Sequence, residues 1–224
     1  MTRTVAIDGP SGAGKSTIGY ALAQRIDANF VDTGLMYRAL TLAALERGLG
    51  VDDGEPLGRL ATQCRIEVER PEPGQTDRLE TVRLNGRDVT IEVRAPRIDR
   101  AVSAVSRHAA VRDAMLGVQR AVAARGDTVM VGRDIGTVVL PDATLKVFLT
   151  AAPFVRAARR AAEMHAPERL AEYLAEIERR DAADSQRPIA PLREPEGALV
   201  LDTGALDVIA CVDAIVARLE RAGA

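Results

Sequence analysis

Residues 9–17 read Gly-Pro-Ser-Gly-Ala-Gly-Lys-Ser-Thr, a complete match to the phosphate-binding pattern G-x-x-x-x-G-K-[ST]. The five residues before it, 4–8, form a short, apolar and β-branched run of the kind that favours a buried strand. After it, apolar residues recur at helical spacing from Ile18 to Ile26. Strand, glycine loop and helix therefore follow one another in the order that a polyphosphate-binding loop requires. The alternative is a glycine-rich turn that matches by chance.

The residue types of this loop fit a nucleoside triphosphate. The glycines let backbone N–H groups approach the phosphates, the Lys15 ammonium has the reach for the β- and γ-phosphates, and the Ser16 hydroxyl is a ligand for Mg²⁺. The chain has only two lysines, Lys15 and Lys146, and every other basic residue except two histidines is arginine. A lysine kept in such a sequence indicates a compact point charge among phosphates. The predicted nucleotide contacts are Gly9, Pro10, Ser11, Gly12, Ala13, Gly14, Lys15, Ser16 and Thr17.

Length and composition restrict the class of protein. With 224 residues, 47% of them hydrophobic, the chain can bury a sizeable core, either in one α/β domain with an insertion or in one large and one small domain. A net charge of −2 implies no general attraction to nucleic acid or to an anionic membrane. The glycine loop begins almost at the first residue and no apolar run is long enough to cross a bilayer. We therefore expect a cytoplasmic enzyme with neither nucleic acid nor membrane as a partner.

Four further segments have the composition of buried strands, and helical patterns lie between them. The strands are expected at 29–33, 127–131, 144–149 and 198–201, and the helices at 36–47, 98–125 and 206–221. Strands that alternate with helices predict a five-stranded parallel sheet with helices on both faces. Ligands of such sheets bind beyond the carboxyl ends of the strands. Those ends carry Asp8-Gly9, Asp32-Thr33, Gly132-Arg133-Asp134 and Asp202-Thr203.

Residues 65–93 interrupt this alternation. Two alternating runs, 80–84 and 87–91, flank Asn85-Gly86, and Asn-Gly between such runs is a strong hairpin signal. A third run lies at 65–68. The sequence therefore predicts a small antiparallel sheet at 65–93, inserted into a core made of 1–64 and 94–224.

Arginines gather at several predicted strand and helix ends. Arg38 and Arg133 follow strands, where ligands bind, and guanidinium groups suit phosphates. Arg156, Arg159 and Arg160 share one side of a predicted helix, where an anion could offset their mutual repulsion. A late helix carries Arg179, Arg180, Asp184 and Arg187. A solvated helix face is the simpler interpretation of Arg179, and for the other groups a purely structural role stays open.

Several classes of phosphate-loop protein are disfavoured. GTPases need Asn-Lys-x-Asp to select guanine, but the only lysine after the loop, Lys146, follows Leu145. Many motor and transporter ATPases place an acid directly after an apolar strand, whereas Val131 is followed by Gly132-Arg133. The two histidines are isolated in sequence, and no Ser-His-Asp or metal-ligand constellation is visible. Small-molecule and nucleotide kinases, in which arginines hold the acceptor, remain.

Within that class the sequence resembles the bacterial cytidylate kinases, which belong to the nucleoside monophosphate kinase family. The resemblance rests on four stretches that span nearly the whole chain in the family's order, 7–16, 32–38, 132–139 and 178–192. The inserted sheet is similar to that family's enlarged monophosphate-binding region. Two residues depart from the family's usual pattern: Val131 stands where an acid is usual, and Leu35 where a smaller residue is usual.

The resemblance implies ATP-dependent phosphorylation of CMP and dCMP to CDP and dCDP, with Mg²⁺. It further implies that Thr33, Ser103, Arg112 and Asp134 contact cytosine, that Arg38, Arg133 and Arg187 hold the acceptor phosphate, and that Arg180 and Asp184 hold the ribose. The catalytic cations it implies are Lys15, Arg133, Arg156, Arg159 and Arg160, the last three on a lid at about 153–168. A monomer is expected. A kinase for UMP or a small metabolite, and an ATP-binding module without transferase activity, remain as alternatives.

Overall fold

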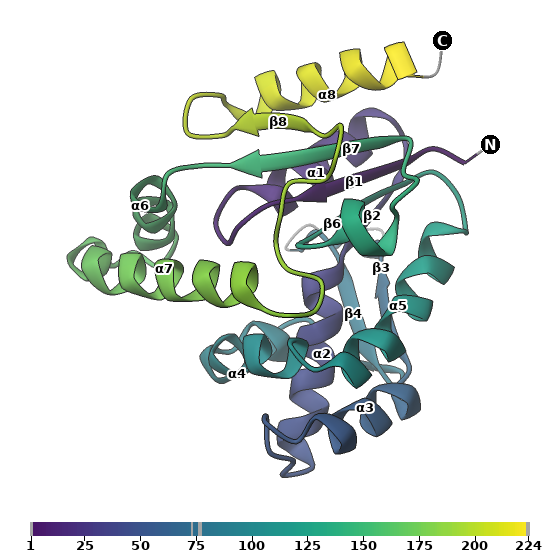
Figure 1. Ribbon diagram of the computed structural model, residues 1–224, viewed down its shortest axis with the longest axis vertical. Helices are drawn as coiled ribbons and strands as arrows, with labels where there is room; N and C mark the ends of the chain where they lie inside the picture. The colour runs from purple at the N-terminus through teal and green to yellow at the C-terminus, as the bar shows by residue number, and fades with distance from the viewer. Residues whose placement is uncertain (1, 73, 76–77, 223–224) are drawn as a thin grey trace. The chain divides into compact units, whose positions relative to one another are not determined.

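Strand β1, Thr4–Asp8, lies in the middle of a five-stranded sheet with the order β2-β6-β1-β7-β8 (Figure 1). The structure is a computed structural model and describes residues 2–72, 74–75 and 78–222. Val5, Ala6 and Ile7 are fully buried, as expected of a parallel strand with a neighbour on each side and both faces covered. The predicted α/β class with a five-stranded sheet is confirmed.

The chain divides into two compact units. One consists of Met1–Ala28 with Asp127–Ala224, and the other of Asn29–Gly126. The two units reflect which residues pack together. The predicted insertion at 65–93 instead marks the stretch where antiparallel strands replace the alternation of parallel strands and helices. The inserted strands pack against the helix at the start of the second unit, so they share a core with their flanking helices.

The first unit holds the phosphate loop and most of the sheet. Its elements are β1, α1 (Lys15–Arg25), β6 (Thr128–Gly132), η2 (Ile135–Val139), β7 (Leu145–Thr150), α6 (Pro153–Glu163), η3 (Pro167–Arg169), α7 (Leu170–Gln186), β8 (Leu199–Asp202) and α8 (Val208–Ala222). β1 pairs in parallel with β6 and β7, and β8 pairs in parallel with β7. The helices α1 and α8 pack together, α1 on β6 and α8 on β7. Because parallel strands end at the same edge, Asp8 lies beside Gly132, and the loops after β1 and β6 are neighbours.

Helices α6 and α7 pack side by side in the first unit (Figure 1). Their shared core consists of Ala157, Ala161, Tyr173 and Ile177. Pro153 and Pro167 start α6 and η3, where a missing N–H costs nothing. The segment predicted as the lid therefore forms α6 and η3, supported by α7.

The second unit begins with the edge strand of the sheet and contains the insertion. Its elements are β2 (Asn29–Asp32), α2 (Thr33–Glu46), α3 (Gly54–Gln63), β3 (Ile66–Glu69), β4 (Thr81–Leu84), β5 (Arg87–Asp88), η1 (Glu92–Arg94), α4 (Pro96–Ser106) and α5 (Ala109–Ala123). α2 packs on β3, β4, η1, α3 and α4, and α3 packs on α5. The strands β3, β4 and β5 form an antiparallel sheet, as predicted.

The hairpin between β4 and β5 has the predicted turn. Asn85 and Gly86 adopt φ values of 52° and 83°, which suit the twist of a two-residue hairpin loop. The second strand of this hairpin is shorter than predicted, because the Thr90 hydroxyl accepts the Val82 N–H at 2.9 Å and the chain then turns into η1.

The prediction of one helical stretch at 98–125 was wrong in one respect, because the structure has two helices there. α4 ends at Ser106 and α5 begins at Ala109. His108 between them is extended, with φ −74° and ψ 130°, and its Nε2 lies 2.8 Å from the Val51 carbonyl oxygen. The break therefore depends on a contact that is distant in sequence. His165, by contrast, is exposed.

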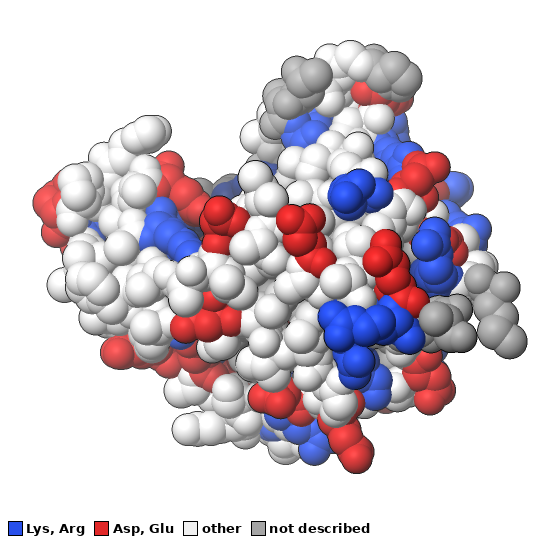
Figure 2. Space-filling view, turned by 90° about the horizontal axis from the view of Figure 1, so that it is seen from above, with Lys and Arg blue, Asp and Glu red and all other residues white. Residues whose placement is uncertain are grey.

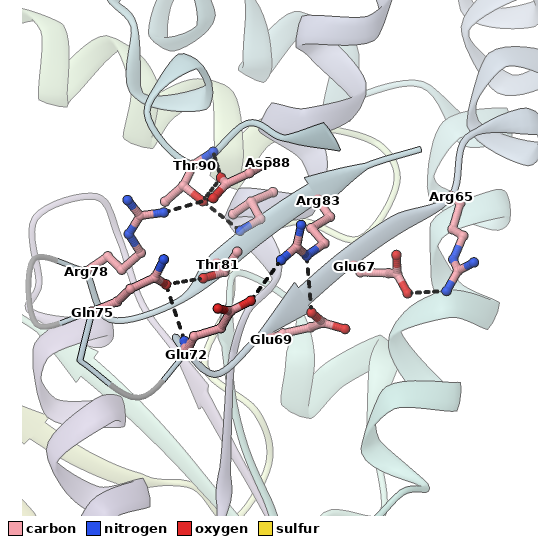
Figure 3. A network of polar contacts seen from close by, with 11 residues as sticks. Arg65, Glu67, Glu69, Glu72, Gln75, Arg78, Thr81, Arg83, Asp88 and Thr90 are labelled. Atoms are coloured by element: carbon pink, nitrogen blue, oxygen red, sulfur yellow. Dashed lines mark hydrogen bonds and ion pairs between the residues drawn. The ribbon is translucent and has the colours of Figure 1, made fainter. Parts of the chain in front are cut away.

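The outer face of the inserted sheet carries a network of charged side chains (Figure 3). Arg83 lies 3.6 Å from Glu69 and 3.5 Å from Glu72, and Arg65 lies 2.7 Å from Glu67. These side chains are between 22% and 77% exposed, and ion pairs in contact with water contribute little to stability. The sheet is therefore stabilised chiefly by its buried face, made of Ile66, Val68, Val82 and Leu84.

Basic and acidic side chains are interspersed on the face of the molecule that Figure 2 displays. This agrees with the near balance of 30 basic and 32 acidic residues. Among the described residues, none of the helices combines the length and the hydropathy that a membrane span needs.

Candidate active site

The backbone of the loop between β1 and α1 requires glycine at two positions, Gly9 and Gly14. A Cβ at Gly9 would lie 2.3 Å from the Leu149 carbonyl oxygen, so the loop could not sit against β7 with any other residue there. Gly14, the N-cap of α1, has a left-handed φ of 82°. These two glycines allow the loop to turn tightly and to present the N-terminus of α1, where backbone N–H groups and the helix dipole favour an anion.

Lys15 is the first residue of α1 and folds back over the loop. Its Nζ donates to the Pro10 carbonyl oxygen at 2.7 Å, and the residue is only 8% exposed. Ser16 follows it at the half-buried start of the same helix. The sequence-predicted contact residues of the loop therefore surround one helix N-terminus.

Arg156 of α6 contacts the backbone of the phosphate loop. Its guanidinium donates to the Ser11 carbonyl at 3.0 Å and to the Ala151 carbonyl at 2.8 Å, and it pairs with Asp181 of α7 at 2.6 Å. Arg156 is buried. Because one side chain joins the loop, the end of β7 and α7, the position of α6 depends on the position of the loop.

The other two arginines of α6 differ from it. Arg159 donates to the Thr203 hydroxyl at 3.0 Å and also to the Thr203 carbonyl, and that hydroxyl lies 3.2 Å from the Ala13 carbonyl oxygen. Arg159 is therefore linked to the loop through the segment after β8. Arg160 has a half-exposed side chain 3.6 Å from Glu163. By spacing the three arginines share one side of the helix, and these bonds link Arg156 and Arg159 to the loop.

A cluster of arginines and carboxylates lies after β6 and along the end of α7. Arg133 donates to Asp184 at 2.8 Å, and the Arg187 guanidinium lies 3.5 Å from the Asp134 carboxylate. Burial acts to raise the pKa of Asp184, but the charges of Arg133, Arg180 and Arg187 outweigh it, so the pKa lies below its ordinary value. Asp184 is therefore ionised at neutral pH. The predicted residues Arg133, Asp134, Arg180, Asp184 and Arg187 come together in one unit, whereas Arg179 is exposed, as expected of a solvated position.

Asp8 occupies the end of β1, directly before the loop, and is fully buried. One carboxylate oxygen accepts the Ile135 N–H and the other accepts the Gly136 N–H, both at 2.7 Å. Burial raises the pKa of Asp8 to about 6, even though the two amides and the Lys15 charge act to lower it.

The second unit holds the remaining predicted residues. Thr33 is buried at the start of α2, directly after the N-cap Asp32, whose carboxylate accepts the Gly34 N–H at 2.9 Å. Arg38, one turn further along α2, donates to the Val93 carbonyl at 3.1 Å and pairs with Asp99 of α4. This pair holds the Arg38 guanidinium at one position beside α4.

Arg112 and Ser103 lie on different helices of the second unit. The Arg112 guanidinium stacks 5.4 Å from the centre of the Tyr37 ring and donates to the Ser106 carbonyl at 3.1 Å. Arg112 is buried, so these contacts fix its orientation. Ser103 is half-buried on α4. Thr33, Arg38, Ser103 and Arg112 therefore form the part of the predicted set that belongs to the second unit.

Several carboxylates that contact the predicted site residues or their neighbours were not predicted from the sequence. Glu80, between β3 and β4, is 2% exposed and accepts the Asp32 N–H at 2.8 Å, beside the start of α2. Burial and the Asp32 charge raise its pKa well above the ordinary value. Asp99 and Asp181 pair with Arg38 and Arg156. A lone acidic residue in a charged chain carries no distinguishing pattern, so nothing local could have revealed these partners.

The family model described as cytidylate kinase matches residues 5–221. The chain belongs to the cytidylate kinase family. The cytidylate kinase of Geobacillus sp. (strain WCH70) is 45% identical over 94% of this chain and 93% of its own length. That of Exiguobacterium sibiricum is 46% identical over 96% of this chain and 94% of its own length. Among solved structures, an uncharacterized protein from Eubacterium ventriosum is similar in fold, with a TM-score of 0.55, 11% identity and coverage of 97% of this chain and 98% of its own.

Membership of the cytidylate kinase family makes this chain a phosphotransferase of the nucleoside monophosphate kinase class. Val131, one of the two departures from the family's usual pattern, is fully buried in β6 and pairs with Ile7 of β1. An apolar side chain there belongs to the sheet core. Leu35, the other departure, is buried in α2.

Proposed function

We propose that this chain transfers the γ-phosphate of ATP to CMP and to dCMP, giving ADP with CDP or dCDP. The observation that carries the proposal is that the first unit contains both a complete phosphate loop and a buried cluster in which Arg133 pairs with Asp184 and Arg187 with Asp134. The loop supplies the means to bind the donor. The cluster supplies oriented donors and acceptors of the kind that a nucleotide's phosphate, ribose and base require.

The donor side rests on the loop at 9–17. Its backbone N–H groups and the N-terminus of α1 favour the phosphates of ATP. Lys15 would exchange the Pro10 carbonyl for phosphate oxygens, a movement that its flexible stem allows. Arg156, Arg159 and Arg160 on α6 would supply further positive charge on the lid at 153–168 as the transferred group moves.

Mg²⁺ fits the residues at the start of α1. Ser16 offers one hydroxyl beside the loop, and Mg²⁺ commonly takes one or two protein ligands together with phosphate oxygens and water. We propose Ser16 as the protein ligand. Bound there, the ion would neutralise charge on the phosphates.

We propose the following roles in recognition of the acceptor. Arg38, Arg133 and Arg187 would bind the acceptor phosphate, and Arg180 and Asp184 the ribose. Asp134 would accept a hydrogen bond from the cytosine 4-amino group while Arg112 donates to O2 and N3, with Thr33 and Ser103 as further base contacts. Uracil has an acceptor in place of that amino group, so a buried carboxylate would face a carbonyl. Sites built on such hydrogen bonds can discriminate by ~10⁴ or more.

The chemistry needs no nucleophile from the protein. The acceptor phosphate oxygen attacks the γ-phosphorus of ATP in line, and the bond to the β-phosphate oxygen breaks. Lys15 and the arginines align the two phosphates and stabilise the charge that develops between them. The side chains therefore act by position and charge.

Measuring ADP release with CMP, dCMP, UMP, AMP, dTMP and shikimate as acceptors tests the proposal. We expect the highest kcat/KM with CMP and dCMP. A higher value with UMP or another acceptor would overturn the substrate assignment. Tight ATP binding with no acceptor-stimulated ADP release would indicate a binding module instead.

We also propose that the protein acts as a monomer in the cytoplasm, where ATP and CMP are available. Light scattering on the purified chain and fractionation of its source cells are the tests. A stable dimer at assay concentrations would contradict the first proposal, and recovery in the membrane fraction the second.

A further inference from the structure

We propose that Asp8 is a positioning residue for base selection, which orients Asp134 by binding the two backbone amides that follow it. The inference rests on the proposed function, in which Asp134 contacts cytosine. Asp8 does not itself touch the substrate, and all the contacts used here lie within the first unit.

The contact is bidentate and specific. The two oxygens of Asp8 accept from consecutive amides, Ile135 and Gly136, each at 2.7 Å. These distances are short for N–H···O bonds, as expected when the acceptor is charged. Two bonds from one rigid carboxylate to adjacent amides fix both the position and the direction of the peptide that follows Asp134.

Asp134 depends on this anchor because its own backbone is irregular. Its φ of −145° and ψ of 26° belong to neither helix nor strand, and its side chain makes no capping bond to η2. The segment that it precedes, η2, is a short π-helical turn, in which the Asp134 carbonyl accepts the Val138 and Val139 N–H groups at 2.9 and 3.2 Å. Asp8 holds the backbone on one side, and Arg187 contacts the carboxylate on the other. Asp8 therefore fixes the backbone that carries Asp134, and Arg187 contacts its carboxylate, so the two together set the direction in which Asp134 points.

Burial of a carboxylate would otherwise be unfavourable at this place. Asp8 has no exposed surface, and an apolar residue would fit the end of a buried strand without the cost of removing a charge from water. The two amide bonds offset part of that cost, and only while η2 keeps its present position. Since Asp8 directly precedes Gly9, the same residue connects the loop proposed to bind ATP with the segment proposed to select the base.

A purely structural role for Asp8 makes a different prediction. If Asp8 only stabilised the fold, its replacement would lower the turnover of every acceptor to the same extent. If it orients Asp134, replacement should affect CMP far more than UMP, because only cytosine presents the amino group that Asp134 is proposed to bind.

The test is Asp8→Asn, which keeps one acceptor and turns an NH₂ group toward an amide N–H. We expect kcat/KM for CMP to fall by about ten- to a hundredfold, the loss that corresponds to one charge-assisted hydrogen bond. The values of kcat/KM for UMP and KM for ATP should change by less than roughly threefold, so the CMP-to-UMP ratio should shrink. Asp127→Asn is the matched control. Asp127 also accepts a backbone N–H, from Arg3 at 2.8 Å, but it lies directly before β6 with 28% of its side chain exposed, and its replacement should leave the ratio unchanged.

A double-mutant cycle separates this inference from the proposed function. Asp134→Ala alone should collapse the CMP-to-UMP ratio, and adding Asp8→Asn should then change it no further. An unchanged ratio in Asp134→Ala would refute the role of Asp134 in the proposed function. A collapsed ratio there, with equal losses for CMP and UMP in Asp8→Asn, would overturn the inference alone. If Asp8→Asn does not fold by circular dichroism, Asp8→Ser, which is smaller and keeps one oxygen acceptor, takes its place in the same cycle.

Discussion

Arginine–carboxylate pairs lie in two different settings in this chain. In the first unit the side chains of Arg187 and Asp134 are each 6% exposed, and those of Arg133 and Asp184 are 18% and 9% exposed. In the inserted sheet of the second unit, the side chains of Arg65 and Glu67 are 77% and 22% exposed. Both settings pair arginine with a carboxylate, aspartate in the first unit and glutamate in the inserted sheet. The distances are similar, 2.8 and 3.5 Å in the first unit against 2.7 Å for Arg65 and Glu67.

Burial determines whether such a pair holds its two side chains in a fixed orientation. An exposed pair is surrounded by water, which screens the attraction, so the pair changes stability by about 0–1 kcal/mol and does not hold its side chains in place. A buried pair cannot exchange its partner for water, so each member orients the other. The buried pairs can therefore present guanidinium and carboxylate groups to a ligand in a defined geometry. The following predictions test this contrast.

The largest effect should come from the buried lysine. Lys15→Met keeps the apolar stem but removes the charge beside the phosphates, and kcat should fall by about 10³-fold or more. Lys146→Met, which replaces the other lysine of the sequence, is the matched control and should change kcat by less than about threefold. Steady-state ADP release measures both variants, with circular dichroism to establish folding. Near-normal turnover in Lys15→Met would contradict the role given to that residue.

Breaking a buried pair should have the next largest effect. Asp184→Asn leaves Arg133 without its charged partner, so KM for CMP should rise by about ten- to a hundredfold while KM for ATP stays within about threefold. The free energy of unfolding should drop by about 3 kcal/mol, because the Arg133 charge, with 18% of its side chain exposed, loses its carboxylate partner in a largely buried place. Glu176→Gln, at an exposed position of the same helix, should change neither quantity. Equal rises in both KM values would show that Asp184 does not act on the acceptor.

The pH dependence of stability should separate two kinds of buried acid. The pKa of Asp8 is raised to about 6, so the folded state binds this proton more tightly than the unfolded chain, and the contribution of Asp8 to stability increases as the pH falls from 7 toward 4. At pH 4.5 this contribution to the free energy of unfolding is about 2 kcal/mol larger than at pH 7. The pKa of Asp184 is lowered, so its contribution has the opposite sign and is lost as the pH falls below about 4.

Urea denaturation of the wild type and of Asp8→Asn at pH 7 and pH 4.5 measures this difference. The neighbouring charges Asp134 and Lys15 are the same in both proteins. The wild type should gain stability relative to the variant at the lower pH. A constant difference between the two proteins at both pH values would mean that Asp8 has an ordinary pKa.

The smallest effect is expected on the inserted sheet. Arg83→Ala removes the exposed contacts to Glu69 and Glu72, and unfolding should become easier by less than about 0.5 kcal/mol. Thermal unfolding should shift by less than about 2 °C, and kcat/KM for CMP should be unchanged. A loss above about 1 kcal/mol would break the distinction between exposed and buried pairs, because it would show that the network in Figure 3 stabilises the sheet.

Patterns among neighbouring residues were sufficient to predict much of the fold. The loop at 9–17, the parallel strands and the hairpin at Asn85-Gly86 were predicted because each depends on neighbouring residues: glycines that allow unusual backbone angles, and apolar residues at a strand or helix period. The break between α4 and α5 was missed because it depends on the bond from His108 to Val51, which lies 57 positions away in sequence.

The phosphate loop, the α/β class and, through its motifs, the family could all be inferred from the order of the residues alone. The tertiary structure decided which arginine meets which acid: Arg133 with Asp184, Arg156 with Asp181, Arg38 with Asp99. It also decided that Asp8 anchors the segment after Asp134. The physical reason is that charge pairing depends on distance and burial, and a chain with 30 basic and 32 acidic residues allows far too many pairings for spacing alone to select among them.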